Sequence, residues 1–353
     1  MYNYIIHKLK GGRNVKTVKV KLKPTKPQAL ELKRMSLEYI RQANLLIRVA
    51  ESEGKFPNYT SKNIESNLPS SVKNELIRYA KSKYQKYGKC FFKKQTVSWN
   101  NQNFSVNKNS ICFPMMKEGK AKRTLIKAII PDELYSLISS SKLGSLRVTK
   151  KGHHWMALLS IPIPLNVTSN TDILGVDLGI LCPAVGVIKS SGKTIFLGNG
   201  RQNKFVRRKY NSLRKELSKK KKIKAIKNIR DKESLIMRDV NHKISRKLIR
   251  FAIDNHCGVI HLEDLSGIHR TSKAGGKNKA NLHNWSFYEL SSFIKYKARE
   301  AGIKVVQVDP EYTSQECPSC GQLNKVKSRQ YLCLCGYKAH RDRVGAINIA
   351  KKT

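Results

Sequence analysis

Four cysteines in the C-terminal part of the sequence constrain the fold of their surroundings most strongly. Two residues lie between Cys317 and Cys320, and one residue lies between Cys333 and Cys335. The two pairs are separated by 12 residues. Two close thiolate pairs joined by a short loop are typical of a tetrahedral zinc site, in which four thiolates leave no position open for water. A glycine after the second cysteine of each pair permits a tight turn. We therefore predict one structural Zn²⁺ ion, and the alternative of four unrelated free thiols fits this spacing poorly. The other four cysteines show no ligand spacing and are expected to be core residues: Cys90, Cys112, Cys182 and Cys257.

Three acidic residues occupy unusual positions in this acid-poor sequence. Asp177 interrupts the apolar run ILGVDLGI, Glu263 ends the apolar run CGVIHLE, and Asp342 opens a predicted C-terminal helix that starts near Arg341. Parallel and mixed sheets collect functional groups at one edge of neighbouring strands. Three carboxylates meeting there repel each other, and two Mg²⁺ ions would neutralise them and form a clamp for phosphodiester cleavage. The three residues are therefore candidates for both the catalytic and the Mg²⁺-binding positions.

The same carboxylates have a simpler interpretation as helix caps or ion-pair partners of the many lysines. Spacing alone also does not exclude three neighbouring acidic residues as members of the site: Asp264, Asp309 and Glu311. The order of the predicted elements favours the catalytic interpretation. Strand with Asp, hairpin, helices, strand with Glu, helix, strand and helix with Asp is the order of an RNase H-like nuclease core.

Positive charge dominates the chain. Its 353 residues include 70 Lys and Arg but only 24 Asp and Glu, which gives a formal net charge of +46. Only nucleic acid or an anionic membrane would neutralise so much charge. The sequence contains no apolar run of the roughly 18 residues that a membrane-spanning helix needs, and its N-terminus lacks the pattern of a signal peptide. We expect a cytoplasmic protein, associated with the nucleoid when acting, that binds nucleic acid and not membranes.

The most basic segment spans residues 201–255, where two helices are expected to pack as a hairpin. Residues 201–250 alone hold 20 Lys and Arg against 4 Asp and Glu. A run of lysines usually marks a solvated face, but the charge of the whole chain favours a surface that follows phosphates. The predicted nucleic-acid contacts are Arg207, Arg208, Lys219, Lys220, Lys221, Lys222 and Arg341. His340, beside Arg341, either contacts the scissile phosphate or simply begins the last helix.

The N-terminal half shows a different pattern of predicted helices and strands. It is expected to contain a strand at 18–22, helices at 29–49 and 71–86, and, from Thr96 onward, short β-type runs around one helix at 131–139. Short strands at this spacing predict a β-barrel or sandwich. In the first helix we expect the core-facing stripe to comprise Leu30, Met35, Ile40, Leu45 and Val49. Further along the chain, residues 269–285 are rich in Gly and Lys and are expected to form a mobile loop.

Several motifs together resemble the TnpB (OrfB) proteins of bacterial insertion sequences, which are related to type V CRISPR effector nucleases. The resemblance rests on GVDLGI, on VIHLEDL, on the stretch from WSFYEL to EYTSQECPSCG, and on CLCGYKAHRDRVGAINIA. The strong match covers residues 171–350, and the N-terminal half matches only in the general order of its predicted elements. Two departures concern the last motif, where Val344 and Gly345 replace the Asn and Ala of many relatives, and the second cysteine pair, which is C-x-C.

The resemblance implies an α/β protein with an RNase H-like (RuvC) nuclease core, an inserted zinc ribbon and a preceding wedge β-barrel that a helical recognition lobe interrupts. It implies boundaries at 1–28 and 96–168 for the barrel and 29–95 for the lobe. The core would span 169–313, the ribbon 314–338 and the last core helix 339–353. Asp177, Glu263 and Asp342 would form the RuvC site, and the ribbon would be the target-nucleic-acid-binding insert.

The resemblance further implies an RNA-guided DNA endonuclease. Its guide RNA would come from the transposon end, and it would cut double-stranded target DNA beside a short target-adjacent motif. The protein would act as a monomer or a homodimer on the RNA. Two alternatives remain: a cleavage-inactive RNA-guided repressor, and a transposase that joins DNA strands with the same core.

Overall fold

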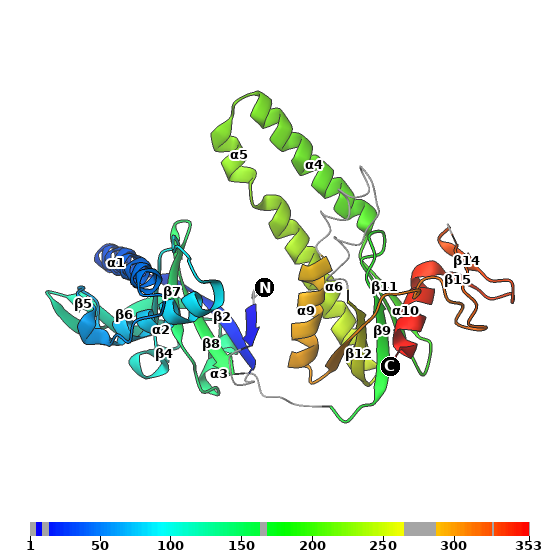
Figure 1. Ribbon diagram of the computed structural model, residues 1–353, viewed down its shortest axis with the longest axis horizontal. Coiled ribbons are helices and arrows are strands. Elements are labelled where there is room, and N and C mark those ends of the chain that lie inside the picture. The colour runs from blue at the N-terminus through cyan, green and yellow to red at the C-terminus, as the bar shows by residue number, and fades with distance from the viewer. Residues whose placement is uncertain (1–4, 9–13, 163–167, 265–286, 327, 353) are drawn as a thin grey trace. The chain divides into compact units, whose positions relative to one another are not determined.

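The computed structural model describes residues 5–8, 14–162, 168–264, 287–326 and 328–352 (Figure 1). The chain divides into two compact units, Met1–Pro164 and Leu165–Thr353. The segment 269–285, for which the sequence predicts a mobile loop, lies outside the described residues. Within the described ranges, no helix combines the length and the apolar character that crossing a bilayer requires.

An eight-stranded antiparallel sheet forms the body of the first unit, in the order β3-β7-β8-β2-β6-β5-β4 with β1 paired to β2. The predicted β-type runs coincide with strands of this sheet. The strands are β1 (Ile5–Lys8), β2 (Asn14–Lys23), β3 (Thr96–Trp99), β4 (Ser105–Asn107), β5 (Ser110–Lys117), β6 (Lys120–Ile129), β7 (Leu146–Lys151) and β8 (His154–Pro162).

The sheet curls so that β3, at one end of the order, contacts β5, which lies next to the strand at the other end. Trp99 of β3 is fully buried against Phe113 of β5, with 4.4 Å between the ring centroids. The Trp99 indole Nε1 donates a hydrogen bond of 3.1 Å to the Pro114 carbonyl. Among the described strands, β3 and β5 are not paired through backbone hydrogen bonds. They are connected by these side-chain contacts instead.

Helices α1 (Lys26–Ser52) and α2 (Ser70–Tyr87) are inserted between β2 and β3, and α3 (Asp132–Ser139) follows β6. Thr25 caps α1 reciprocally with Gln28, which explains why the helix begins there. The expected apolar stripe of α1 is only partly right: Met35 is buried, but Leu30 is 61% and Leu45 38% exposed. Steps of five residues rotate about 140° around a helix and cannot stay on one face. The buried face instead follows steps of three and four residues: Leu32, Met35, Tyr39, Ala43, Leu46 and Ala50.

The second unit is built on a five-stranded mixed sheet in the order β11-β10-β9-β12-β13. Its strands are β9 (Asp172–Asp177), β10 (Ala184–Ile188), β11 (Thr194–Leu197), β12 (Cys257–Glu263) and β13 (Lys304–Val308). β9, β12 and β13 run parallel, whereas β10 and β11 form the antiparallel hairpin that the sequence predicts.

Helices cover both faces of this sheet (Figure 1). On one face, α6 (Lys232–Asp254) and α9 (Phe287–Glu300) pack against Leu174 and Val176 of β9 and against Ile260 and Leu262 of β12. On the other face lies α10 (Arg341–Lys351). It approaches β9 so closely that a Cβ at Gly175 would overlap the Ala346 carbonyl oxygen, so only glycine fits there.

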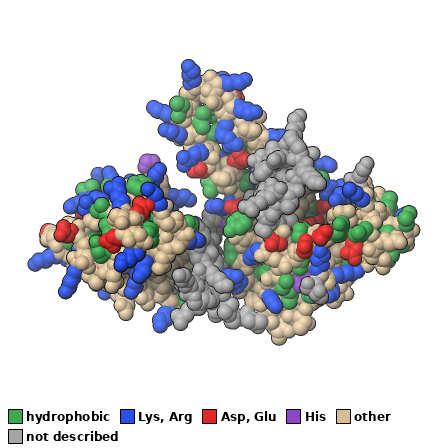
Figure 2. All heavy atoms as spheres, viewed as in Figure 1, with side chains coloured by type: hydrophobic (Ala, Val, Ile, Leu, Met, Phe, Trp, Pro, Cys, Tyr) green, Lys and Arg blue, Asp and Glu red, His purple; other side chains and the backbone are tan. Residues whose placement is uncertain are grey.

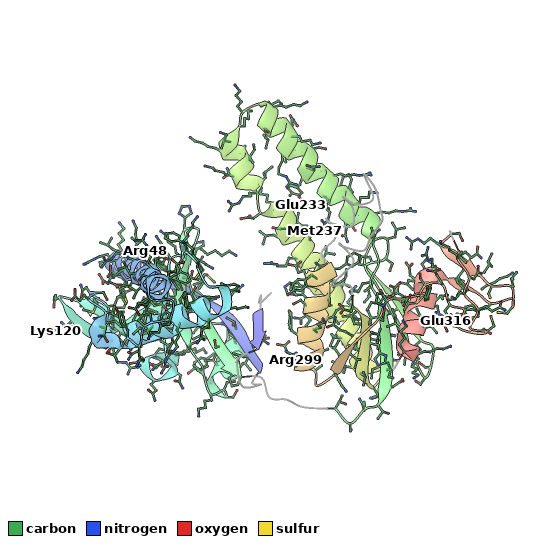
Figure 3. All side chains as sticks on the ribbon, viewed as in Figure 1. Arg48, Lys120, Glu233, Met237, Arg299 and Glu316 are labelled. Atoms are coloured by element: carbon green, nitrogen blue, oxygen red, sulfur yellow. The ribbon has the colours of Figure 1, made fainter. Side chains whose placement is uncertain are left out.

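The basic segment folds as a hairpin of α4 (Gly200–Lys219) and α6, joined by a turn and the short helix α5 (Ile223–Ile229), which the sequence did not predict. Lys221 adopts a positive φ of 51° in the turn. Arg214 of α4 pairs with Glu233 of α6 at 2.6 Å and links the two arms. Figure 3 labels Glu233 on α6. A small hairpin of β14 (Gln330–Leu332) and β15 (Lys338–His340) carries the second cysteine pair and leads directly into α10.

Candidate metal centres and nucleic-acid surface

Strand alternation sends the acidic residues of β9 and β12 toward α10. Leu174 and Val176 face the α6–α9 side, so Gly175 and Asp177 face the other side. Leu262 pairs with Val176 across the parallel strands, which brings Asp177 and Glu263 to equivalent positions at the carboxyl ends of their strands. Gly345 of α10 lies over them, and a Cβ built there would come within 3.1 Å of the Asp177 Oδ2.

Asp177 lies in an environment that disfavours its charged form. Burial raises the pKa of its carboxyl group well above the ordinary value, and the negative charges of Glu263 and Asp342 raise it further. Arg341 and Arg329 offset part of this effect. The charges of Glu263 and Asp342 both act on Asp177, so the three predicted carboxylates lie near one another.

Glu263 is 8% exposed, and its Oε1 accepts a hydrogen bond of 2.7 Å from the Thr313 hydroxyl. Burial raises the pKa of Glu263, while the Thr313 hydrogen bond and the charge of Lys352 lower it in part. Asn348 of α10 donates to the Thr313 carbonyl at 2.8 Å and fixes the segment that carries this hydroxyl. Thr313 therefore orients one oxygen of Glu263 and leaves the other for a further ligand.

Asp342 opens α10 and is 7% exposed. Its Oδ1 accepts a hydrogen bond of 2.7 Å from Arg329, while its Oδ2 is buried without a hydrogen-bond partner among the described residues. A buried carboxylate oxygen without a donor is costly unless a cation or proton satisfies it. The Asp342 backbone N–H donates to Nδ1 of His340 at 3.2 Å, so His340 is the residue that begins the helix.

This arrangement fits oxygen-preferring divalent cations. Asp177 and Glu263 have raised pKa values, and Asp342 has an unsatisfied oxygen. Carboxylate oxygens in such a group are the hard negative ligands that Mg²⁺ prefers. The oxygen atoms of the three carboxylates lie farther apart than the ligands of a single metal ion. Among the described residues, the four cysteines alone form a group of metal-ligating side chains whose ligand atoms all lie within 4.8 Å of one another.

The competing acidic residues lie elsewhere. Asp264, Asp309 and Glu311 are exposed. Asp309 accepts the backbone N–H of Glu311 at 2.9 Å in a local turn. Of the acidic side chains at these strand ends, only Glu263 both is buried and adds to the field at Asp177.

Cys317, Cys320, Cys333 and Cys335 come together as the sequence predicts. Their Sγ atoms are 3.7 Å apart for Cys317 and Cys335, and 3.6 Å for Cys320 and Cys333. A tetrahedron with Zn–S bonds of about 2.3 Å places its sulfurs about 3.8 Å apart. The four thiols therefore fit one Zn²⁺ ion with little rearrangement.

Local turns shape the thiol cluster. Gly321 and Gly336 have φ values of +75° and +87°, which only glycine adopts without strain, and each closes the turn of its cysteine pair. At Cys317 burial raises the thiol pKa, but the backbone N–H groups of Cys320 and Ser319 outweigh it and lower the pKa to about 7. Of the other cysteines, Cys257 is buried and the remaining three are half-buried.

The cysteine hairpin and α10 share one small core. Val344 of α10 is fully buried against Cys317 and Tyr331. Arg329, at the start of the hairpin, reaches Asp342, and its carbonyl accepts the Arg341 backbone N–H at 2.8 Å. The metal-binding segment therefore supports the helix that carries an acidic site residue.

The predicted basic contacts differ in accessibility. Arg208 and Lys219–Lys222 are exposed, and Figure 2 shows Lys and Arg side chains over the α4–α6 hairpin. Arg207 is half-buried, and burial lowers the pKa of its guanidinium. The Arg341 guanidinium donates to the Ser314 hydroxyl and the Val326 carbonyl, so it is held beside the hairpin.

Sequence reasoning missed three residues that shape the acidic site: Thr313, Arg329 and Asn348. All three act through chain reversals between β13 and α10, which apolar periodicity does not reveal. The available signal concerned only Thr313, a polar residue that lies near the first cysteine pair in the motif EYTSQECPSC, whereas Arg329 and Asn348 lie outside that motif.

Known proteins resemble this chain in both sequence and fold. A family model described as "Cas12f1-like, TNB domain" matches residues 287–349. The CRISPR-associated endodeoxyribonuclease Cas12f1 of Sulfoacidibacillus thermotolerans is 41% identical over 134 residues, which cover 37% of this chain and 30% of that relative. The Cas12f1 of Syntrophomonas palmitatica is 26% identical over 342 residues, which cover 82% and 68%. The TnpB-like protein MJ0751 of Methanocaldococcus jannaschii is 35% identical over 125 residues, which cover 35% and 45%.

A solved structure extends the likeness to nearly the whole chain. The cryo-EM structure of a Cas12f1–sgRNA–target DNA complex aligns with a TM-score of 0.70 and 16% identity over 91% of this chain and 81% of that one. At this identity the alignment shows a shared fold. The matched region spans less than half the length of two of the three relatives above.

Proposed function

The chain belongs to the TnpB family of proteins related to type V CRISPR effectors, and from this premise we propose that it is an RNA-guided DNA endonuclease. The observation that carries the proposal is the grouping of Asp177, Glu263 and Asp342 on one face of the five-stranded sheet. This chain has few acidic residues, and three of them are held together at a cost in repulsion. Such a cost is expected where metal-dependent chemistry needs the charge.

The three carboxylates would hold two Mg²⁺ ions. When bound, the ions supply activation of a water molecule and stabilisation of the leaving 3′ oxygen. Thr313 holds one oxygen of Glu263, and α10 holds Asp342 beside Asp177. The sheet of residues 172–308 with α6, α9 and α10 would be the RNase H-like core, and the cysteine hairpin the zinc ribbon inserted in it.

The partners proposed for this protein are a guide RNA from a transposon end and double-stranded target DNA. The +46 charge and the exposed lysines of the α4–α6 hairpin support nucleic-acid binding. The eight-stranded unit with its inserted helices would correspond to the wedge barrel and recognition lobe, which would read the target-adjacent motif.

The test begins with expression beside the native flanking DNA and sequencing of the RNA that co-purifies. One structured RNA with a variable 3′ end is expected, and that end defines the target for a cleavage assay in Mg²⁺. Asp177→Ala should abolish cleavage and keep RNA binding. Asp309→Asn is the matched control, because this exposed residue keeps its local hydrogen bond as asparagine.

Each alternative predicts a different outcome. Cleavage that persists in Asp177→Ala would remove this residue from the site. Guided DNA binding without any cleavage would establish a repressor. Joined strands in place of simple breaks would establish a transposase, and heterogeneous host RNA would refute RNA guidance.

A further inference from the structure

The first unit contains a pocket that the proposed cleavage does not use. It has a volume of about 220 Å³ and lies between α1, α2, the segment after α2, and strands β3, β7 and β8. Pockets for drug-sized ligands measure about 300–1,000 Å³, so this one suits a smaller group. Its lining combines aromatic rings with Lys93, Lys94 and Arg147, and no carboxylate is among the described lining residues.

The aromatic wall is held in place from behind. Tyr79 contacts Phe92 with 5.1 Å between ring centroids, and the Arg147 guanidinium carbon lies 5.0 Å from the centroid of the Tyr79 ring. Asn44 of α1 fixes the backbone of Phe92 through two hydrogen bonds, of 3.1 Å and 2.8 Å. Because its neighbour is anchored, Phe91 is presented at the pocket with 63% of its surface exposed.

A buried polar group supports a ligand at this place. Tyr39 is fully buried and lines the pocket, yet its hydroxyl has no hydrogen-bond partner among the described residues. Burial raises the pKa of Tyr39, and Ser98 lies near enough to its hydroxyl to offset part of that rise. The Ser98 hydroxyl itself accepts a hydrogen bond of 3.3 Å from Arg147. Buried hydroxyl groups in native proteins are normally satisfied, so an incoming acceptor would complete the site.

We propose that this pocket binds one unpaired nucleotide, whose base stacks on Phe91 and whose phosphate is neutralised by Lys93, Lys94 and Arg147. Aromatic rings beside cations are the means by which proteins hold single-stranded nucleic acid. The nucleotide comes either from the RNA or from a displaced DNA strand. The inference rests on the proposed function only in that nucleic acid is the partner, and it requires no cleavage.

The test uses the full chain and short single-stranded RNA or DNA carrying one 5-iodouracil, in Mg²⁺-free buffer with enough salt to weaken phosphate contacts. Irradiation should crosslink the base to the peptide that contains Phe91 and Phe92. A crosslink with RNA alone assigns the pocket to the guide, and a crosslink with DNA assigns it to the displaced DNA strand. Crosslinks found only outside the pocket, with both oligonucleotides, would overturn the proposal.

Variants separate stacking from simple apolar packing. Phe91→Ala and Phe91→Leu should both weaken binding by roughly 5- to 100-fold, the range for loss of one base–aromatic stack. Phe91→Trp keeps a ring and should keep binding. Tyr87→Ala removes a 58%-exposed aromatic of the same helical module outside the pocket and should bind normally. Wild-type affinity in Phe91→Leu would contradict stacking. If the wild-type protein cleaves target DNA but forms no crosslink at Phe91 or Phe92, the pocket is refuted and the proposed nuclease is not.

Discussion

At the scale of single residues, the metal-free fold disfavours the ionised form of the Asp177 carboxyl group. Its pKa is raised by burial and by Glu263 and Asp342, so its protonated form is the one that folding favours. A raised carboxyl pKa contributes stability below the unfolded pKa of about 4, and this contribution is lost as pH rises through the folded pKa. The metal-free protein should therefore lose stability as pH rises above about 4.

Asp177→Asn should raise the stability of the metal-free protein at neutral pH. Each unit of pKa shift corresponds to about 1.4 kcal/mol, and the gain should be on that order. The variant should also lose the stabilisation that Mg²⁺ gives the wild type, measured by thermal unfolding with and without Mg²⁺. Asp309→Asn should change neither, and a destabilised Asp177→Asn would show that the carboxylate is paired and not repelled.

The sequence predicted the carboxylates because acidic residues are rare in it and these three sit in or beside apolar runs. Arg329 and Thr313 could not be predicted in the same way. Each meets its carboxylate through a loop reversal, and a loop reversal leaves no period in the sequence. Arg341 was predicted as a phosphate contact. Its guanidinium donates hydrogen bonds to Val326 and Ser314. The contact with phosphate stays a prediction.

At the scale of elements, the α6–α9 contact holds a histidine that must stay neutral. His242 of α6 stacks on Phe293 of α9 with 4.0 Å between ring centroids. Burial lowers its pKa to about 4, and the nearby Lys297, Arg238 and Arg246 add to this effect while Glu289 opposes it. A histidine with a depressed pKa contributes stability above about 6.5 that is lost as pH falls toward 4.

His242→Phe, which keeps the stacked ring, should flatten the dependence of the unfolding temperature on pH between about 6.5 and 4. The effect should be on the order of 1 kcal/mol, because partial exposure of the ring screens the charge. His153→Phe alters an exposed histidine and is the matched control. An unchanged pH profile in His242→Phe would place the acid sensitivity elsewhere.

Zinc removal should loosen the helix that carries Asp342. Val344 of that helix packs against Cys317 and Tyr331, so loss of the metal removes support from α10. Cys317→Ser should reduce the zinc content from one ion per chain to none and should speed hydrogen exchange in residues 341–351. Cys112→Ser, which alters a half-buried cysteine outside the cluster, should do neither. Full zinc content in Cys317→Ser would contradict the four-thiolate site.

Element predictions succeeded where the period was regular. Apart from β1, which was not predicted, the strands of both sheets and helices α2, α3 and α9 follow from apolar runs and breaker residues. The buried face of α1 was misjudged because several of its leucines are exposed and mimic a stripe. The short α5 was missed because its seven residues carry no buried side chain to set a pattern.

At the scale of the whole molecule, the charge should act through its location as well as its amount. Binding to the co-purified RNA should weaken roughly 10³-fold between low and moderate salt. Replacing Lys219–Lys222 with alanine should reduce the salt dependence by about 0.9 in log–log slope for each phosphate that the variant no longer neutralises. The control replaces Lys117, Lys120, Lys122 and Lys127 of the eight-stranded sheet and removes equal charge. Equal effects of both sets would mean that net charge alone drives binding.

The architecture of the second unit was predictable because its element order permits few sheet arrangements. The closure of the first sheet was not predictable. It depends on Trp99 reaching Pro114 across the curled sheet, a contact between β3 at one end of the sheet order and β5 next to the other end. Contacts of this kind depend on how far the sheet curls, which local sequence does not specify.

The small core shared by the cysteine hairpin and α10 also limits how relatives of this protein can diverge. A recombination event with a crossover between Tyr331 and Val344 would join the ribbon of one lineage to the terminal helix of another, and the two halves of this core would no longer match. Crossovers before the first cysteine pair keep the halves together. Residues 314–351 should therefore be inherited as one block, and surviving chimaeras of natural homologues should have their junctions outside it.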